Sequence, residues 1–481
     1  MGVLSELEPK EVFQYFEDLC GIPHGSYHEA ELSDYCVAFA KEHHLEVIQD
    51  ELKNVIIIKP ATAGYEQVPT LILQGHLDMV CEKTEDCKID FQTDGLELEV
   101  EGDYISAKGT TLGGDDGIAV AYALAILASD TLKHPRLEVV LTIAEEVGME
   151  GAARIDLSSL QGKKLLNMDS ENEGILLTSC AGGAGVSAVL PIARAEKTGI
   201  LYEIHLDHLT GGHSGVEIDK GRANANVLMG RILLSCRKQL PYDLVDINGG
   251  LKDNAIPRSC VARILIAPDN EKKLEEVIER ESKNVCHEYR NADPAMSLQA
   301  VKCTATQLQA LEETDKTTLL MLMNALPNGI QTMSLNIEGL VETSLNMGIL
   351  KTEETTVTMS YAVRSSVSTA REALTEKMQA IIEYMGASFT IAGVYPGWAF
   401  KEDSKLREDM ITVYEKMYGN KPKIEAVHAG VECGLLSDKI EGLDCISIGP
   451  DMKNIHTAQE QLCISSAKRV WEYIVQVIAY K

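Results

Sequence analysis

The order of apolar and polar positions predicts strands that alternate with helices in the first third of the chain. Three short apolar runs are expected to form buried strands: residues 54–59 (NVIIIK), 70–74 (TLILQ) and 137–143 (LEVVLTI). Residues 117–129 (GIAVAYALAILAS) are apolar nearly all round, which is typical of a buried helix. A fourth strand pattern ends in Asp169. This alternation indicates an α/β layer architecture.

The pattern changes between residues 187 and 396. Alternating strand patterns stand there beside long amphipathic helices such as residues 271–290, and α/β character then returns with a strand at 445–449. We therefore predict an α/β domain with a mixed sheet flanked by helices, formed by residues 1–186 and 397–481, and an inserted α+β domain of residues 187–396. The sequence shows no internal repeat.

The net charge restricts the partners. At a formal charge of −29 the chain lacks the basic surface that neutralises phosphate groups, so we expect no nucleic acid and no anionic membrane as a partner. No apolar run approaches the ~20 residues of a membrane span, and the acidic N-terminus lacks a signal-peptide pattern. The 12 cysteines are scattered without a regular framework. We expect a cytoplasmic protein with mostly reduced thiols.

Acidic residues and histidines follow the ends of the predicted strands. They are His76 and Asp78 after residues 70–74, Asp115 and Asp116 in the loop before the buried helix, Glu145 and Glu146 after residues 137–143, Asp169, and His456 after the strand at 445–449. Each has a simple structural explanation: paired acids often begin a helix, an aspartate caps one, and a lone histidine is usually a surface residue. Coincidence is a poor explanation for acids and histidines at the ends of all these strands, because clustered carboxylates repel one another unless a cation neutralises them.

A site for two divalent metal ions explains this cluster. Imidazole nitrogens and carboxylate oxygens are ligands for Zn²⁺, with Mn²⁺ and Co²⁺ as alternatives. One bridging carboxylate and two further ligands for each ion require five residues. His76, Asp115, Glu146, Asp169 and His456 supply that set. Asp78 then orients an imidazole, and Glu145 remains as a carboxylate that can take a proton from water.

A set of motifs extends this pattern over the whole chain: GHLDMV, TTLGGDDGIAVA, TIAEEVGMEGA, NMDSE, GGHSG, GLVETSLNMG, HAGVECG and IGPDMKNIHT. Together they resemble the aminoacylase–carnosinase clan of dinuclear zinc metallopeptidases, and within it the aminoacyl-histidine dipeptidases, also called Xaa-His, beta-alanyl-histidine or cytosol non-specific dipeptidases. The resemblance implies that Asp115 bridges the metals, that His76 and Asp169 complete one site, and that Glu146 and His456 complete the other. It also implies Asp78 as the orienting residue and Glu145 as the general base.

The resemblance further implies a catalytic domain built from both chain ends and an inserted lid through which two chains form a homodimer. His213, in GGHSG, matches a lid histidine that stabilises a substrate oxyanion in several members; a turn residue between glycines is the alternative. Arg364, Asn254 and Gly430 are candidates to bind the terminal carboxylate of the substrate, since the arginine fork suits a carboxylate. Asp116 departs from the pattern, because close relatives often carry asparagine there.

The implied activity is hydrolysis of small unblocked dipeptides, such as Xaa-His peptides of the carnosine type, by a water held between two metals with a glutamate as general base. The alternatives are a tripeptidase, an aminoacylase or a carboxypeptidase of the same clan, and a non-catalytic metal-binding protein. A serine hydrolase is not supported, because the chain contains no GxSxG motif.

Overall fold

The computed structural model describes residues 2–481, which form two compact units. Of the described residues, unit 1 comprises 2–179, 400–426 and 431–481. Unit 2 comprises residues 180–399 and 427–430. Residues 180–186, 397–399 and 427–430, which were predicted to belong to the first domain, belong to unit 2. Within residues 2–481 no helix has both the length and the apolar character that crossing a membrane requires.

Unit 1 is built on an eight-stranded mixed sheet, as predicted. The strands in spatial order are β1 (Glu46–Gln49), β2 (Val55–Lys59), β6 (Leu137–Thr142), β3 (Leu71–His76), β7 (Lys164–Asn167), β21 (Asp444–Ser447), β8 (Ile175–Cys180) and β20 (Lys423–Val427). The central strands β6, β3, β7 and β21 run parallel, whereas β1, β2 and β8 pair antiparallel with their neighbours. The carboxyl ends of the four parallel strands therefore meet at one edge of the sheet.

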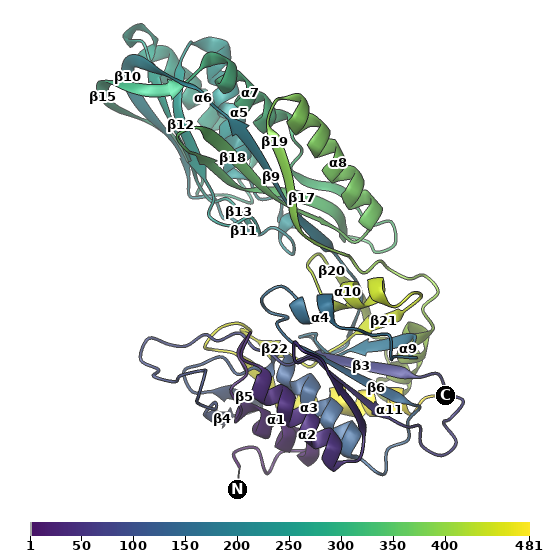
Figure 1. Cartoon of the computed structure of the whole chain (residues 1–481). Coiled ribbons are helices and arrows are strands. Elements are labelled where there is room, and N and C mark those ends of the chain that lie inside the picture. Colours follow the sequence, from purple (N-terminus) through teal and green to yellow (C-terminus); the bar gives the residue numbers. More distant parts are fainter. Residues whose placement is uncertain (1) are drawn as a thin grey trace. The chain divides into compact units, whose positions relative to one another are not determined.

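Helices cover both faces of this sheet (Figure 1). Alternate strand side chains, such as Leu71 and Leu73, join one core with the helices α1 (Lys10–Cys20), α2 (Ala30–Glu42), α3 (Gly114–Ala128), α9 (Lys405–Tyr418) and α11 (Ile464–Ile478). The opposite face carries polar side chains such as Gln74, which bonds to the first residue of α10 (Glu432–Lys439). The short helix α4 (Glu150–Arg154) packs against α10. Helix α3 is thus apolar nearly all round because it is buried on all sides.

A small second sheet connects the end of the chain to the loop region before α3. It contains β22 (Met452–Lys453), β23 (Gln461–Cys463), β5 (Tyr104–Ala107) and β4 (Leu98–Glu101), in that order. The loop between β22 and β23 carries His456. This pairing brings residues that are far apart in the sequence to the same edge of the main sheet.

Unit 2 consists of two halves with the same topology. The first half runs β10 (Arg194–Asp207), α5 (Ala225–Gln239), β12 (Asp243–Gly249), β14 (Cys260–Ile266), α6 (Glu271–Glu288) and β15 (Ser297–Leu311). The second runs β9 (Gly182–Pro191), α7 (Glu313–Ala325), β17 (Val341–Thr352), β18 (Thr356–Ser365), α8 (Ser368–Tyr384) and β19 (Ser388–Tyr395). Each is a β-α-β-β-α-β unit of the ferredoxin-like type, and the first half is inserted between β9 and α7 of the second.

The two halves share one antiparallel sheet. Its order is β15-β10-β14-β12-β17-β18-β9-β19, so the halves meet where β12 pairs with β17, and β16 (Gly329–Met333) pairs with β17 beside this junction. Figure 1 shows α5, α6, α7 and α8 against this sheet, in the teal and green part of the chain. This duplication is visible in the order of the elements and not as a repeat in the sequence.

Candidate metal centre

Asp115 lies at the centre of the acidic cluster in unit 1. Its Oδ1 atom is 3.1 Å from Nε2 of His76, and its Oδ2 atom is 3.2 Å from Nε2 of His456. Asp115 is buried near the start of α3, where the backbone departs from helical geometry. Because each oxygen faces a different imidazole, this single carboxylate can contribute a ligand to each of two metal ions.

The first group of donors around Asp115 is buried. His76 ends β3, is 1% exposed, and its Nε2 atom lies 3.6 Å from Oδ1 of Asp169. Asp169 follows β7, the parallel neighbour of β3, so both side chains leave the same edge of the sheet. Ligand atoms of His76, Asp116 and Asp169 all lie within 4.8 Å of one another, and Oδ1 of Asp115 faces the same Nε2 atom of His76. An imidazole nitrogen with carboxylate oxygens is a donor set that suits Zn²⁺, Mn²⁺ and Co²⁺.

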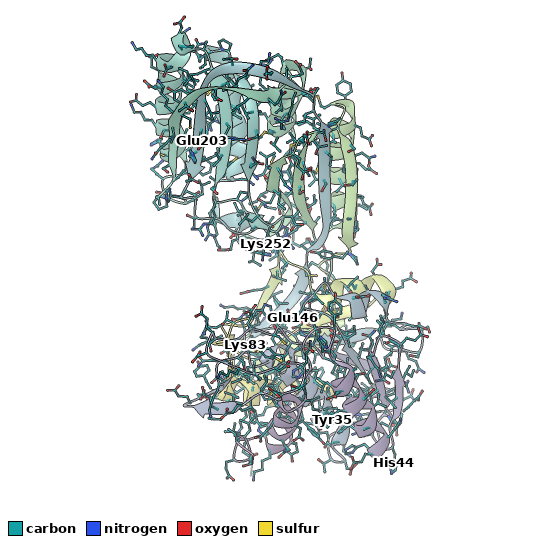
Figure 2. The ribbon with its side chains drawn as sticks, turned by 60° about the vertical axis from the view of Figure 1, so that its left-hand side comes forward. Tyr35, His44, Lys83, Glu146, Glu203 and Lys252 are labelled. Atoms are coloured by element: carbon teal, nitrogen blue, oxygen red, sulfur yellow. The ribbon has the colours of Figure 1, made fainter. Side chains whose placement is uncertain are left out.

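The second group of donors is open to solvent on one side. Nε2 of His456 lies 2.9 Å from Oε1 of Glu146, and the His456 side chain is 45% exposed. Glu146 belongs to the loop after β6 and is labelled in Figure 2. Ligand atoms of Asp115, Glu146 and His456 all lie within 4.8 Å of one another, which is close enough for them to hold one ion.

Asp78 organises the loop that follows β6. Its Oδ1 atom is 3.4 Å from Nδ1 of His76, while its backbone oxygen is closer to that nitrogen, at 3.0 Å. The same carboxylate accepts hydrogen bonds from the backbone N–H groups of Glu145 at 2.9 Å and Glu146 at 3.2 Å, and from the hydroxyl of Ser26 at 2.8 Å. Asp78 therefore fixes the backbone of two site residues in addition to facing the imidazole.

Glu145 borders the cluster without a hydrogen bond to either histidine. Burial raises the pKa of its carboxyl well above the ordinary value, His76 opposes this effect, and the carboxylates of Asp169, Glu432 and Glu146 add to it. A carboxyl whose pKa is raised by burial holds a proton more readily than an exposed one, which suits a group that accepts a proton and later releases it. The geometry is consistent with the base predicted from the sequence.

The charge of the cluster fits a pair of cations. Hydrogen bonds to Asp115 and Glu146 raise the pKa of His456 to about 11. Burial raises the pKa of Asp169 to about 8, and the carboxylate of Asp115 raises it as well. Without cations the cluster therefore retains extra protons, because it concentrates more negative charge than its surroundings can solvate. Divalent ions would replace those protons, as metal binding does at carboxylate and imidazole ligands.

Two further buried acids border the metal ligands. Oδ2 of Asp116 accepts a hydrogen bond from the backbone N–H of His76 at 3.1 Å. Oε2 of Glu432 accepts hydrogen bonds from Nε2 of Gln74 at 2.5 Å and from the hydroxyl of Thr142 at 2.7 Å. Within residues 2–481 the second oxygen of each acid has no hydrogen-bond partner. Burial raises the pKa of Glu432 to about 7.

His213 and Arg364 lie close together in unit 2, one from each half. A Cβ atom at Gly215 would be 2.9 Å from Cε1 of His213 and 3.1 Å from Nε of Arg364. Nδ1 of His213 accepts hydrogen bonds from the backbone N–H groups of Gly215 and Val216, each at 3.2 Å. The neutral ring therefore carries its proton on Nε2. Arg364 is 8% exposed and donates to the hydroxyl of Tyr395 at 3.2 Å.

His428 adjoins the same pair and was not predicted from the sequence. Its carbonyl oxygen would be 2.3 Å from a Cβ atom at Gly215, and its Nε2 atom lies 2.8 Å from the hydroxyl of Ser344. Burial, together with the positive charge of Arg364, lowers the pKa of His428 to about 4. A neutral histidine and a buried arginine together provide hydrogen-bond donors and one positive charge for an anion.

The remaining sequence candidates show fewer contacts. Asn254 is exposed, and its carbonyl oxygen accepts a hydrogen bond from the backbone N–H of Ser214 at 2.8 Å, next to His213. Gly430 follows Ala429 in the segment 427–430 of unit 2. The motif HAGVECG could have directed attention to His428 and Glu432, since it places a histidine and an acid on either side of Gly430. Only Gly430 was predicted from it.

Comparisons with known proteins agree on one family. Residues 72–480 match the family model of peptidase family M20/M25/M40. The chain is 36% identical over 480 residues to cytosol non-specific dipeptidase of Escherichia coli strain K12, covering 99% of both chains. The crystal structure of aminoacylhistidine dipeptidase from Vibrio alginolyticus matches with a TM-score of 0.94 and 38% identity, covering 99% of this chain and 98% of that one. An aminopeptidase of Bacillus cereus ATCC 10987 shares the fold, with a TM-score of 0.58 at 16% identity.

Asp115→Asn should abolish the paired arrangement of metal ions. The asparagine side chain has one oxygen and an amide group that only donates, so it cannot face two cations. We expect the metal content to fall from two ions to less than one ion per chain, as measured by elemental analysis after dialysis. Asp34→Asn, which changes an exposed acid on α2, should keep two. Two tightly bound ions in the Asp115→Asn protein would refute the bridging role.

Proposed function

Because the chain belongs to peptidase family M20/M25/M40, we propose that it hydrolyses the peptide bond of small unblocked dipeptides, including Xaa-His peptides, with two divalent metal ions as cofactors. The observation that carries this proposal is Asp115, whose two oxygens face different histidines. A carboxylate oxygen of Glu145 lies within 4.8 Å of ligand atoms of His76 and Glu146. The names of the relatives that match over the whole length, a non-specific dipeptidase and an aminoacylhistidine dipeptidase, support a dipeptide substrate.

His76 and Asp169 would hold one ion, Glu146 and His456 the other, and Asp115 both. When bound, such a pair supplies Lewis acidity that polarises the scissile carbonyl and lowers the pKa of the attacking water. We propose Zn²⁺ as the first choice, and Mn²⁺ or Co²⁺ as alternatives, because the mixed nitrogen and oxygen donors suit all three.

Glu145 moves the proton in the proposed reaction. Its carboxylate takes one proton from the attacking water and later donates that proton to the nitrogen of the leaving amine, so the residue ends the cycle as it began. Asp78 keeps this carboxylate in place through the backbone N–H groups of Glu145 and Glu146. Asp78 thereby sets the positions of the proposed base, Glu145, and of the proposed metal ligand, Glu146.

We propose that His213 and Arg364 bind the negatively charged parts of the substrate. The guanidinium of Arg364 suits the terminal carboxylate, with Asn254 and Gly430 as further candidates for that contact. The Nε2–H group of His213 can donate to a carboxylate or to the oxyanion that forms during hydrolysis. We also propose that the protein is a cytoplasmic homodimer that associates through unit 2, which sedimentation analysis of the full chain can test.

A dipeptide panel should separate the proposed activity from its rivals. Enzyme treated with a chelator should be inactive, and added Zn²⁺ or Mn²⁺ should restore cleavage of Gly-His and β-Ala-His. N-acetylated dipeptides should show kcat/KM lower by about 10- to 100-fold, because a hydrogen-bonded ammonium group is worth about 1.5–3 kcal/mol. Preference for N-acetyl amino acids, for tripeptides or for longer chains would favour an aminoacylase, a tripeptidase or a carboxypeptidase instead. No cleavage of any of them would favour a non-catalytic protein.

Glu145→Gln should remove turnover while the metals stay bound. Positioned general acid–base groups contribute about 10²–10⁴-fold to a rate, so kcat should fall by about that factor with two ions still present per chain. Glu150→Gln, on the neighbouring helix α4, removes a carboxylate that only pairs with Arg154 and should leave kcat unchanged. Near-wild-type turnover of Glu145→Gln would show that another group is the base.

Arg364→Lys should weaken substrate binding more than it slows turnover. Lysine keeps the positive charge but loses the planar pair of donors, so we expect KM for Gly-His to rise about 10-fold. Arg231→Lys is the matched control, because Arg231 makes an exposed two-point contact with Glu288 on the helices of the same unit. Equal KM values for both variants would exclude Arg364 from the substrate site.

A further inference from the structure

Glu460 is a buried acid that no part of the proposed mechanism uses. It is 3% exposed and lies directly before β23, at the end of the loop that carries His456. A buried carboxylate is costly unless its oxygens are hydrogen-bonded. The partners of this carboxylate therefore indicate what it is for.

Four consecutive backbone N–H groups donate to Glu460. Its Oε2 atom accepts from Leu112 at 2.8 Å and from Gly113 at 3.1 Å. Its Oε1 atom accepts from Gly114 at 2.8 Å and, in a longer contact, from Asp115 at 3.4 Å. The last donor belongs to the residue whose carboxylate stands between the two histidines.

The loop is shaped to receive this carboxylate. Gly113 has φ of +68°, a left-handed conformation that glycine adopts without strain, and it turns successive N–H groups toward one point. A Cβ atom at Gly114 would lie 3.3 Å from Oε1 of Glu460, which is tighter than an ordinary contact. The two glycines thus form a backbone anion site that is filled from within the chain, at the start of α3, where the helix dipole also favours a negative charge.

We propose that Glu460 is a positioning residue for the metal centre. It fixes the backbone of Asp115 and lies in the same loop as His456, so one side chain sets the bridging carboxylate and the exposed imidazole relative to each other. We expect the ion held by His456 and Glu146 to depend most on this register, because the His456 side chain is 45% exposed. This inference rests on the proposed two-metal function.

The test is the metal affinity of Glu460→Gln. The glutamine amide places an NH₂ group against backbone donors and leaves one acceptor where there were two. Loss of such an outer contact typically weakens metal binding 10- to 100-fold, so we expect the Kd of the weaker of the two ions to rise by about that factor. Calorimetric titration of the chelated protein with Zn²⁺ measures it, and the visible absorption of the Co²⁺-loaded protein should change with the ligand geometry.

Glu138→Gln is the matched control. Glu138 is a fully buried carboxylate of unit 1 that accepts hydrogen bonds from the backbone N–H groups of Gln161 and Gly162 and from Nε of Arg136. It lies near the start of β6, opposite the end that leads to the metal ligands. Both variants should lose thermal stability, and only Glu460→Gln should lose metal affinity. Glu460→Asp keeps the charge on a shorter side chain and should lie between Glu460→Gln and the wild type.

Three outcomes would overturn the inference. Unchanged metal affinity and Co²⁺ spectrum in Glu460→Gln would make Glu460 a purely structural residue. Equal loss of affinity in Glu138→Gln would show a general effect of instability. If Glu460→Gln does not fold, wild-type affinity in Glu460→Asp has the same meaning as the first outcome. Metal affinity is measured independently of catalysis. A wild-type protein that binds two ions but cleaves no dipeptide therefore refutes the proposed function alone. A wild-type protein that binds no ions refutes both the proposed function and the role of Glu460.

Discussion

The mutual repulsion of buried carboxylates is the constraint on which this site depends. Asp115, Glu145, Glu146 and Asp169 converge at the carboxyl edge of one sheet, where burial and proximity raise the pKa values of Glu145 and Asp169. Only positive charge can relieve this repulsion without protonating the acids. The two imidazoles relieve part of it, and the remaining negative charge would favour the binding of divalent ions, as proposed above. The fold of unit 1 can therefore be understood as a scaffold that holds like charges together.

Five acids at or near the candidate site fall into two groups according to their partners. Asp78 and Glu460 accept hydrogen bonds from backbone N–H groups and so stabilise the loops from which other site residues project. Asp115, Glu146 and Asp169 instead face histidines and one another. Backbone donors satisfy the first group, so those acids need no cation. The second group lacks such donors, which leaves its oxygens available as metal ligands.

The duplication in unit 2 gives a structural reason why His213 and Arg364 lie together. His213 comes from the first half and Arg364 from the second, and they meet beside Gly215, near the junction of β12 and β17. Two copies of one topology joined edge to edge bring together loops that neither copy contains alone. A glycine is required at 215, because any side chain there would collide with the carbonyl oxygen of His428.

Local pattern in the sequence determined the strands, the buried helix α3 and the residue types of the metal centre. Apolar runs that end in acids or histidine are visible without a structure, and parallel strands must bring their carboxyl ends to one edge. Tertiary structure alone decided which acids are satisfied by backbone groups. Glu460 meets the loop before α3 across more than 340 residues, and no local rule predicts a contact at that separation. Packing between distant segments likewise decided the duplication in unit 2, the place of His428 and the partners of Glu432. The chemistry of His428 and Glu432 depends on neighbours that the sequence does not place beside them.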